Sequence, residues 1–363
     1  MLDTSGRIGK LRLKNRLVMP PLVTNLGDEE GYVTEESMAY YTKRGKGGFG
    51  LIITEATAIC PRGKGFPCEL GLWREEQIPG YRRLIEALHR EGSKVFVQLH
   101  HTGRQTKRDT IRGQRPEAPS EIPCPVMKEM PEAMTEERIW DVIEAFGDSA
   151  LRAKQAGADG VEIHGAHGYL VAQFMSGYAN KRRDAFGGSF ENRMGFPLEI
   201  VKNIRKKVGP DFPIGFRISY DEKVLGGRVL EETIEAVKLL EKSGVDVIHV
   251  TMGVYESSYY ISADNKLPRG YMRYQTKKIK EAVSIPVISV GRYGQEEANE
   301  ALEKGYADFI AFGRPTIADP ELARKMLEGR PEDIETCGYC NYCLNQIFSG
   351  KKVECVKNIG KNR

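Results

Sequence analysis

The chain has 363 residues, of which 40 % are hydrophobic and 29 % are charged, and this balance excludes a disordered chain, a collagen-like repeat and a disulfide miniprotein. The 54 basic and 50 acidic residues are interspersed and leave a formal charge of +4, so composition gives no reason to expect nucleic acid as a partner. No run approaches the roughly 18 apolar residues of a membrane-spanning helix, and the charged first residues lack the apolar core of a signal peptide. We therefore expect a cytoplasmic protein with no membrane partner.

Eight short apolar segments rich in β-branched residues recur along the chain, and each is followed by a helical pattern. The segments lie at 16–20, 50–54, 94–99, 159–164, 213–219, 245–251, 285–291 and 307–313. The amphipathic stretches lie at 35–45, 75–91, 135–156, 190–208, 230–243, 272–283, 295–304 and 320–327. This alternation is typical of a parallel sheet covered on both faces. Eight such units predict a (β/α)₈ or TIM barrel.

A doubly wound α/β sheet is the competing architecture. It would bind a dinucleotide at a glycine-rich turn after its first strand, and the sequence there, MPPLVTN, contains no glycine. We therefore predict an α/β protein in which residues 1–330 form the barrel and residues 331–363 form a separate C-terminal segment. In a TIM barrel the functional residues gather at the carboxyl ends of the strands, so we expect the site there.

The fourth predicted strand ends in the densest polar motif of the chain, VEIHGAHGYL. His164 ends the strand, and His167 and Tyr169 follow within five residues. Two imidazoles at this spacing can donate paired hydrogen bonds to a carbonyl or carboxylate, or bind a metal. Metal binding is the weaker alternative because no acidic side chain is an obvious third ligand. The motif therefore predicts a site that holds an anionic or carbonyl oxygen.

Two further strand ends carry polar side chains. Gln98, at the end of the third strand, offers both a donor and an acceptor and suits the edge of a heterocycle, although a merely polar strand end is the simpler interpretation. Arg217 lies in the fifth strand, where an unpaired cation is costly. We expect it to meet a bound anion or, with equal weight, to form a buried salt bridge with Glu55 or Glu162.

The seventh and eighth strands each end in glycine followed by arginine, as Gly291–Arg292 and Gly313–Arg314. Glycine lets backbone N–H groups approach a phosphate closely. The loops after these two strands are the usual phosphate site of a TIM barrel. One such dipeptide means little, but two at these strand ends predict a phosphate site.

Four of the seven cysteines lie in the last 27 residues, at Cys337, Cys340, Cys343 and Cys355. An odd count of cysteines without a signal peptide favours a reducing compartment over a disulfide framework. The spacing C-x2-C-x2-C-x11-C, with no histidine, suits an iron–sulfur cluster or a structural zinc. Zinc sites favour two separated C-x2-C pairs, so the spacing favours the cluster.

Together these motifs resemble the old yellow enzyme family of FMN-dependent reductases. More narrowly, they are similar to its iron–sulfur branch, which includes 2,4-dienoyl-CoA reductase, clostridial enoate reductases and trimethylamine dehydrogenase. The resemblance covers nearly the whole chain and rests on KNRLVMPP, QLHHTGR, the block at 161–193, FRIS, SVGR, FGRP and CGYCNYC. It implies a TIM barrel with FMN at the carboxyl ends of the strands.

The resemblance also implies a role for each motif. The flavin ring would lie over the first strand and meet Gln98 and Arg217, the phosphate would lie at the two Gly-Arg turns, and the four C-terminal cysteines would ligate a 4Fe–4S cluster. The implied cofactor-binding residues are Pro20, Pro21, Leu22, Gln98, Arg217, Gly291, Arg292, Gly313 and Arg314.

The implied reaction is reduction of an activated C=C bond in a small unsaturated substrate, an enoate, enone or enoyl thioester. His164 and His167 would bind the carbonyl oxygen and Tyr169 would donate the proton. The cysteine spacing instead matches the amine dehydrogenases of the same branch, but those enzymes have an aromatic residue in place of the histidine pair. An amine dehydrogenase is therefore the alternative function, and a barrel that only binds a ligand or transfers electrons is the third.

Larger members of this branch continue into FAD- and NAD(P)-binding domains, whereas this sequence ends eight residues after Cys355. Either the chain is a truncated or naturally short form, or a separate ferredoxin or flavoprotein delivers electrons by way of the cluster; direct reduction by NAD(P)H is the further alternative. We also expect a homo-oligomer.

Overall fold

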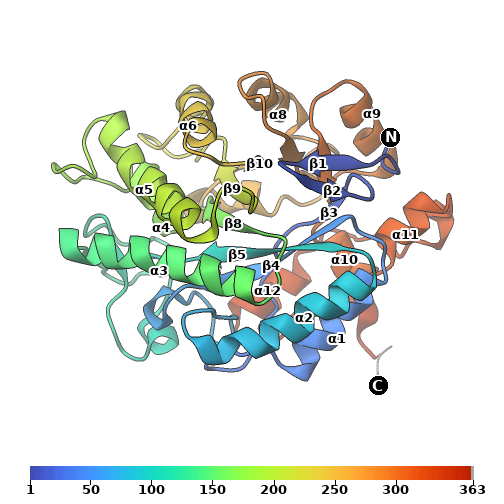
Figure 1. The fold of residues 1–363 in the computed structure, drawn as a ribbon, viewed down its shortest axis with the longest axis horizontal. Coiled ribbons are helices and arrows are strands. Elements are labelled where there is room, and N and C mark those ends of the chain that lie inside the picture. The colour runs from blue at the N-terminus through green and yellow to red at the C-terminus, as the bar shows by residue number, and fades with distance from the viewer. Residues whose placement is uncertain (361–363) are drawn as a thin grey trace.

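The computed structural model describes residues 1–360. Eight parallel strands close into a barrel in which neighbours in the chain are also neighbours in the sheet (Figure 1). The barrel strands are β3 (Leu17–Met19), β4 (Leu51–Ala58), β5 (Lys94–His100), β8 (Gly160–Gly165), β9 (Ile214–Ser219), β10 (Val247–Thr251), β11 (Val287–Ser289) and β12 (Phe309–Ala311). All eight predicted strands are present in order. The prediction of a TIM barrel is confirmed.

Helices surround the strands, as Figure 1 shows. The eight that follow the barrel strands are α1 (Glu35–Gly45), α2 (Ile78–Arg90), α3 (Glu136–Gln155), α5 (Phe190–Val208), α6 (Leu230–Lys242), α8 (Arg273–Lys280), α9 (Gln295–Glu303) and α11 (Leu322–Leu327). Shorter helices are α4 (Leu170–Met175), α7 (Ser258–Ile261), α10 (Pro315–Ala318) and α12 (Tyr342–Phe348). Across the described residues, none of the helices is long and apolar enough to cross a membrane.

The strands are buried along their whole length, and this explains where the predicted boundaries differ from the observed ones. The apolar run of the second strand stops at Thr54, but β4 continues to Ala58 through Glu55 and Thr57, both fully buried. The pairing of β4 with β5 shifts register between Ile53 and Ala56. An irregularity of this kind bends a strand and redirects its side chains. The second half of β4 was therefore not predicted, because polar residues interrupt its apolar run.

A hairpin of β1 (Gly6–Ile8) and β2 (Leu11–Leu13) closes the amino-terminal end of the barrel. Ile8 and Leu13 belong to one buried cluster with interior residues of the barrel, including Phe96 and Phe309. Since Phe309 begins β12, the hairpin lies at the end where the strands start. The opposite end, where the strands finish, is left open for a site. The hairpin was not predicted because its three-residue strands lack a continuous apolar run.

The C-terminal segment packs on the loop that follows the first barrel strand. The backbone N–H of Val353 donates to the carbonyl of Thr24 at 2.8 Å. The side-chain amide of Asn25 donates to the carbonyls of Ile347 and Lys351 at 3.2 and 3.0 Å. Residues 331–360 therefore cover one side of the open end of the barrel. Whether they form an independent unit, as the predicted boundary at 330 implies, stays a prediction.

Candidate functional site

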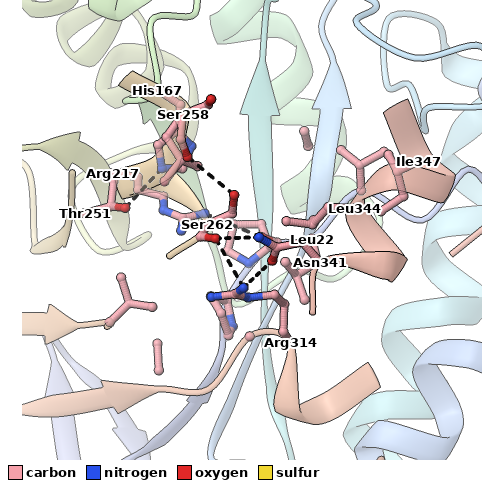
Figure 2. A pocket seen from close by; sticks show the side chains of 18 of the residues that line it. Leu22, His167, Arg217, Thr251, Ser258, Ser262, Arg314, Asn341, Leu344 and Ile347 are labelled. Atoms are coloured by element: carbon pink, nitrogen blue, oxygen red, sulfur yellow. Dashed lines mark hydrogen bonds between the residues drawn. The ribbon is translucent and has the colours of Figure 1, made fainter. Parts of the chain in front are cut away.

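A cavity of about 470 Å³ opens at the carboxyl ends of the strands. Its lining includes every residue that the sequence singled out as catalytic or cofactor-binding: Pro20, Pro21, Leu22, Gln98, His164, His167, Tyr169, Arg217, Gly291, Arg292, Gly313 and Arg314. Residues of α12 and of the loop after β10 complete the wall. Figure 2 shows side chains from strand ends and from the C-terminal segment around one space. Segments far apart in the sequence thus build a single site, while the roles of these residues stay predictions.

His164 and His167 lie with their ring centroids 5.2 Å apart. The Nδ1 atom of His164 accepts a weak hydrogen bond from the N–H of Ala166 at 3.4 Å, which leaves the proton of a neutral ring on Nε2. His167 has a left-handed backbone with φ of 58°. That turn is held by a hydrogen bond from its N–H to the Ser219 hydroxyl, and its Nε2 lies 3.0 Å from the Thr251 hydroxyl.

Both imidazoles are uncharged at neutral pH. Burial is the largest cause that lowers the pKa of His164 and of His167 well below the ordinary 6.5, and the nearby Arg217 guanidinium lowers both further. A neutral imidazole still donates one hydrogen bond from its N–H. The pair can therefore hold an oxygen atom, while the positive charge of the site resides on Arg217.

Tyr169 lies beside the imidazoles, with its ring centroid 4.8 Å from that of His164. Its hydroxyl is 2.9 Å from the hydroxyl of Tyr255. Burial raises the pKa of Tyr169, whereas the hydrogen bond with Tyr255 lowers it. Tyr169 is therefore protonated at neutral pH and can act as a proton donor. The sequence analysis missed Tyr255, because nothing in a tyrosine-rich loop distinguishes a residue that lines a cavity from one that packs on the surface.

Arg217 is buried in β9 and has one weak hydrogen bond, to the carbonyl of Pro21 at 3.5 Å. Its Nε atom has no hydrogen-bond partner among the described residues. Neither Glu55 nor Glu162 forms an ion pair with it in the described chain, so the salt-bridge alternative is not what the structure shows. A buried cation without an anion is costly. The guanidinium is thus suited to an anionic ligand.

Glu162 is occupied instead by two neighbours inside the barrel. It accepts hydrogen bonds from Gln98 Nε2 at 2.7 Å and from His249 Nδ1 at 2.8 Å. One N–H of the Gln98 amide is used in this way, so its amide oxygen and its second N–H are left for a ligand. The network fixes the orientation of Gln98 at the wall of the cavity.

The two Gly-Arg turns present unused backbone donors to the cavity. The N–H groups of Gly291, Arg292, Gly313 and Arg314 donate no hydrogen bond to any described residue. Gly291 has a φ of 142° and Arg292 one of 59°. Several unpaired N–H groups in one concave surface are suited to bind a phosphate.

The arginine side chains at these turns are held by neighbouring segments. Arg314 donates to the carbonyl of Ser262 and to the side chain of Asn341 (Figure 2). It also donates to the carbonyl of Ala263. Arg292 donates to the carbonyl of Leu267. All of these acceptors are neutral, so both guanidinium groups keep an uncompensated charge next to the cavity.

The four C-terminal cysteines lie close enough to influence one another but do not form a metal site here. Burial, with smaller contributions from Cys337 and Cys355, raises the pKa of Cys343 to about 11. The Sγ atom of Cys337 accepts a hydrogen bond from the N–H of Tyr339 at 3.4 Å. Within residues 1–360, no three histidine, cysteine or acidic side chains gather in a way that could hold a metal ion. Ligation of a cluster or of zinc by these thiols therefore stays a prediction.

The chain is similar in sequence and in fold to known oxidoreductases. The chain is 45 % identical over 361 residues to the NADH oxidase of Thermoanaerobacter brockii. The matched region covers 98 % of this chain and 56 % of the relative. Among solved structures, it matches a 2-naphthoyl-CoA reductase bound to 2-naphthoyl-CoA with a TM-score of 0.95 at 33 % identity, over 98 % of this chain and 56 % of the other. It matches histamine dehydrogenase from Rhizobium sp. 4-9 with a TM-score of 0.87 at 32 % identity, over 98 % and 52 %.

The chain thus spans about half the length of these relatives. The model of one family matches residues 7–333, which is nearly the whole barrel. The resemblance inferred from the motifs is confirmed at this level. The chain belongs to the NADH:flavin oxidoreductase / NADH oxidase family.

Proposed function

We propose that this chain binds FMN and reduces a C=C bond conjugated to a carbonyl group, in an enoate, enone or enoyl thioester. When bound, reduced FMN supplies the hydride for such a reaction. The observation that carries the proposal is the convergence in one cavity of two neutral imidazoles, a protonated tyrosine and an unpaired buried arginine. Each of these groups has a use in that reduction.

The residues present fit FMN. Arg217 is an orphan cation that suits the electron-rich N1/O2 edge of a flavin, and the Gln98 amide oxygen suits a ring N–H. The unpaired N–H groups at the turns of Gly291 and Gly313 suit the phosphate. Pro20, Pro21 and Leu22 offer an apolar surface for the ring. Family membership supports the same cofactor.

The remaining side chains act on the substrate. The N–H groups of His164 and His167 would donate hydrogen bonds to its carbonyl oxygen, where negative charge develops as the β-carbon receives hydride. Because both imidazoles are neutral and buried, they stabilise that charge without a change of protonation. Tyr169 would then give its proton to the α-carbon. The product is the saturated carbonyl compound, and the tyrosinate regains its proton from solvent.

The source of electrons belongs to the same proposal. NAD(P)H could reduce the flavin directly, or a ferredoxin or flavoprotein partner could do so by way of a 4Fe–4S cluster on Cys337, Cys340, Cys343 and Cys355. The support for the cluster is the C-x2-C-x2-C-x11-C spacing of these four cysteines.

An amine dehydrogenase is the second candidate, and the likeness to histamine dehydrogenase favours it. A methylated cation is recognised by aromatic faces without hydrogen-bond donors. Here the cavity has Tyr169, Tyr255 and Tyr271 in its wall, but the imidazole pair and Arg217 also face it. Arg217 would repel a cationic amine, so the reductase is the better interpretation.

The test is a pair of half-reactions on protein purified without oxygen and loaded with FMN. The flavin is reduced with dithionite and then mixed with cinnamate or crotonyl-CoA, with the matching saturated compounds as controls. Reoxidation of the flavin by the unsaturated compounds alone would support the proposal. Reduction of the oxidised flavin by histamine or dimethylglycine, with no reoxidation by either alkene, would favour the dehydrogenase instead.

A further inference from the structure

The two arginines at the expected phosphate site share one aromatic neighbour, Tyr339. The guanidinium carbon of Arg292 lies 4.5 Å from the centre of the Tyr339 ring, and that of Arg314 lies 4.9 Å from it. Tyr339 is not part of the barrel: it stands between Cys337 and Cys340 in the C-terminal segment. The cysteine loop therefore touches both arginines of the expected phosphate site through the Tyr339 ring.

The two arginines need this ring because no carboxylate compensates them. Among the described residues, neither takes part in an ion pair, and their hydrogen-bond acceptors are carbonyl or amide oxygens. The Nε atom of Arg292 is buried without a partner. Two like charges repel, and the negative face of an aromatic ring attracts both. Tyr339 is thus the group that stabilises the pair when no anion is bound.

The backbone of the cysteine loop holds the ring in place. Tyr339 has a left-handed conformation with φ of 54°, and its N–H donates to Cys337 Sγ. Two residues on, Asn341 donates to the carbonyl of Ser262 at 2.8 Å and accepts from Arg314. The position of the ring is therefore set by the fold of the cysteine loop.

We propose that Tyr339 is a positioning residue that aligns Arg292 and Arg314 for the phosphate of FMN, and so couples the cysteine loop to the phosphate end of the cofactor. This inference rests on the proposed function, because it takes FMN as the ligand. The inference concerns only the phosphate of FMN. Riboflavin has the same isoalloxazine ring but no phosphate, so comparing the affinities for the two flavins separates an effect on the phosphate from an effect on the flavin ring.

The experiment measures flavin affinity of the full chain, freed of flavin and titrated separately with FMN and with riboflavin by fluorescence quenching. Tyr339→Asn removes the ring and suits the left-handed backbone, while Tyr339→Phe keeps the ring. Tyr342→Asn is the matched control, since its hydroxyl pairs with Gln346 inside α12. We expect Tyr339→Asn to weaken FMN binding about tenfold, or about 1.4 kcal/mol, and to leave riboflavin binding unchanged. Tyr339→Phe and the control variant should bind both flavins like the wild type.

Equal weakening of FMN and riboflavin by Tyr339→Asn would overturn the inference, since the residue would then serve only the fold. So would unchanged FMN affinity in that variant, or a loss in Tyr339→Phe as large as in Tyr339→Asn. If Tyr339→Asn does not fold, as judged by circular dichroism, Tyr339→Leu takes its place under the same expectations. A wild-type chain that binds neither flavin would overturn the proposed function as well, and this result is distinct from the others.

Discussion

The hydroxyl of Tyr169 lies 2.9 Å from the hydroxyl of Tyr255. Tyr169 comes from the turn after β8, and Tyr255 comes from the loop after β10, so two strand ends meet at this hydrogen bond. The bond lowers the pKa of Tyr169 against the larger effect of burial. Tyr255 thereby makes Tyr169 a better acid than burial alone would allow.

Two substitutions test this arrangement. Tyr169→Phe removes the acid and is expected to slow reoxidation of the reduced flavin by an alkene on the order of 10²-fold. Tyr255→Phe keeps the acid but removes its hydrogen bond, so we expect a smaller loss, of several-fold. Rapid-mixing absorbance at the flavin band measures both rates. Tyr259→Phe, at an exposed ring of the same loop, is the control. A loss in Tyr255→Phe larger than in Tyr169→Phe would contradict these roles.

The double variant His164→Ala and His167→Ala is expected to retain FMN and to reduce the alkene on the order of 10²-fold more slowly or worse, because the developing negative charge loses both donors. Flavin content is read from absorbance and turnover from alkene consumption. His89→Ala is the matched control, since His89 pairs with Asp159 outside the cavity. Unchanged turnover in the double variant would show that the imidazoles do not hold the substrate oxygen.

The same imidazoles predict a pH dependence. Because the pKa values of His164 and His167 are well below 6.5, both rings are already neutral at pH 6.5 and stay neutral at higher pH. The rate of alkene reduction should therefore show no fall as pH rises from 6 to 8. If the imidazoles acted as cations, the rate would decline across this range. A pH profile of the reoxidation rate separates the two cases, and the double variant that lacks both histidines serves as its baseline.

The alternation of apolar and helical segments predicted the barrel, and the strand-end motifs together with the family resemblance predicted twelve of the residues that line the cavity. Strand ends in a TIM barrel share one face, so the sequence alone predicted that His164 and Arg217, 53 positions apart in the chain, lie at one site. The partner of Arg217 could not be found that way. Glu162 was an equal candidate, and only the structure shows it bonded to Gln98 and His249 instead.

Contacts between distant loops were also beyond the sequence. Tyr255 and Tyr339 are ordinary tyrosines in tyrosine-rich or cysteine-rich stretches, and their roles arise from rings and hydroxyls that meet only after folding. The N-terminal hairpin escaped notice because short alternating strands resemble a loop. Patterns within one element were visible, whereas contacts between elements were not.

Glu55 gives a prediction for stability. Burial raises its pKa from 4.5 to about 8, and hydrogen bonds from Thr24 and Tyr41 offset only part of that effect. The folded state therefore binds this proton more tightly than the unfolded state. Its contribution to stability is complete below pH 4.5, declines as pH rises and is lost above pH 8. In Glu55→Gln the fall in the free energy of unfolding between low and high pH should be smaller than in the wild type by at least about 1 kcal/mol.

The measurement is the free energy of unfolding in urea at pH 5, 7 and 9. In Glu55→Gln the amide can still accept from the Thr24 N–H and donate to its hydroxyl, so the fold should be kept. Glu86→Gln, on an exposed position of α2, is the control and should follow the wild type. If the free energy of unfolding depended on pH in the same way in all three proteins, the pKa of Glu55 would not be raised by folding and Glu55 would be ionised in the folded state.

The C-terminal cysteines give the last prediction. If Cys337, Cys340, Cys343 and Cys355 ligate a 4Fe–4S cluster, protein purified without oxygen should contain about four iron and four sulfide per chain. Serine at any one of the four should lower both contents, because each thiolate holds one corner of the cluster. Cys68→Ser, outside this group, should change neither. FMN should stay bound in all variants, since its expected contacts come from the barrel. Zinc without sulfide would instead establish a structural metal, and electrons would then have to reach the flavin without a relay.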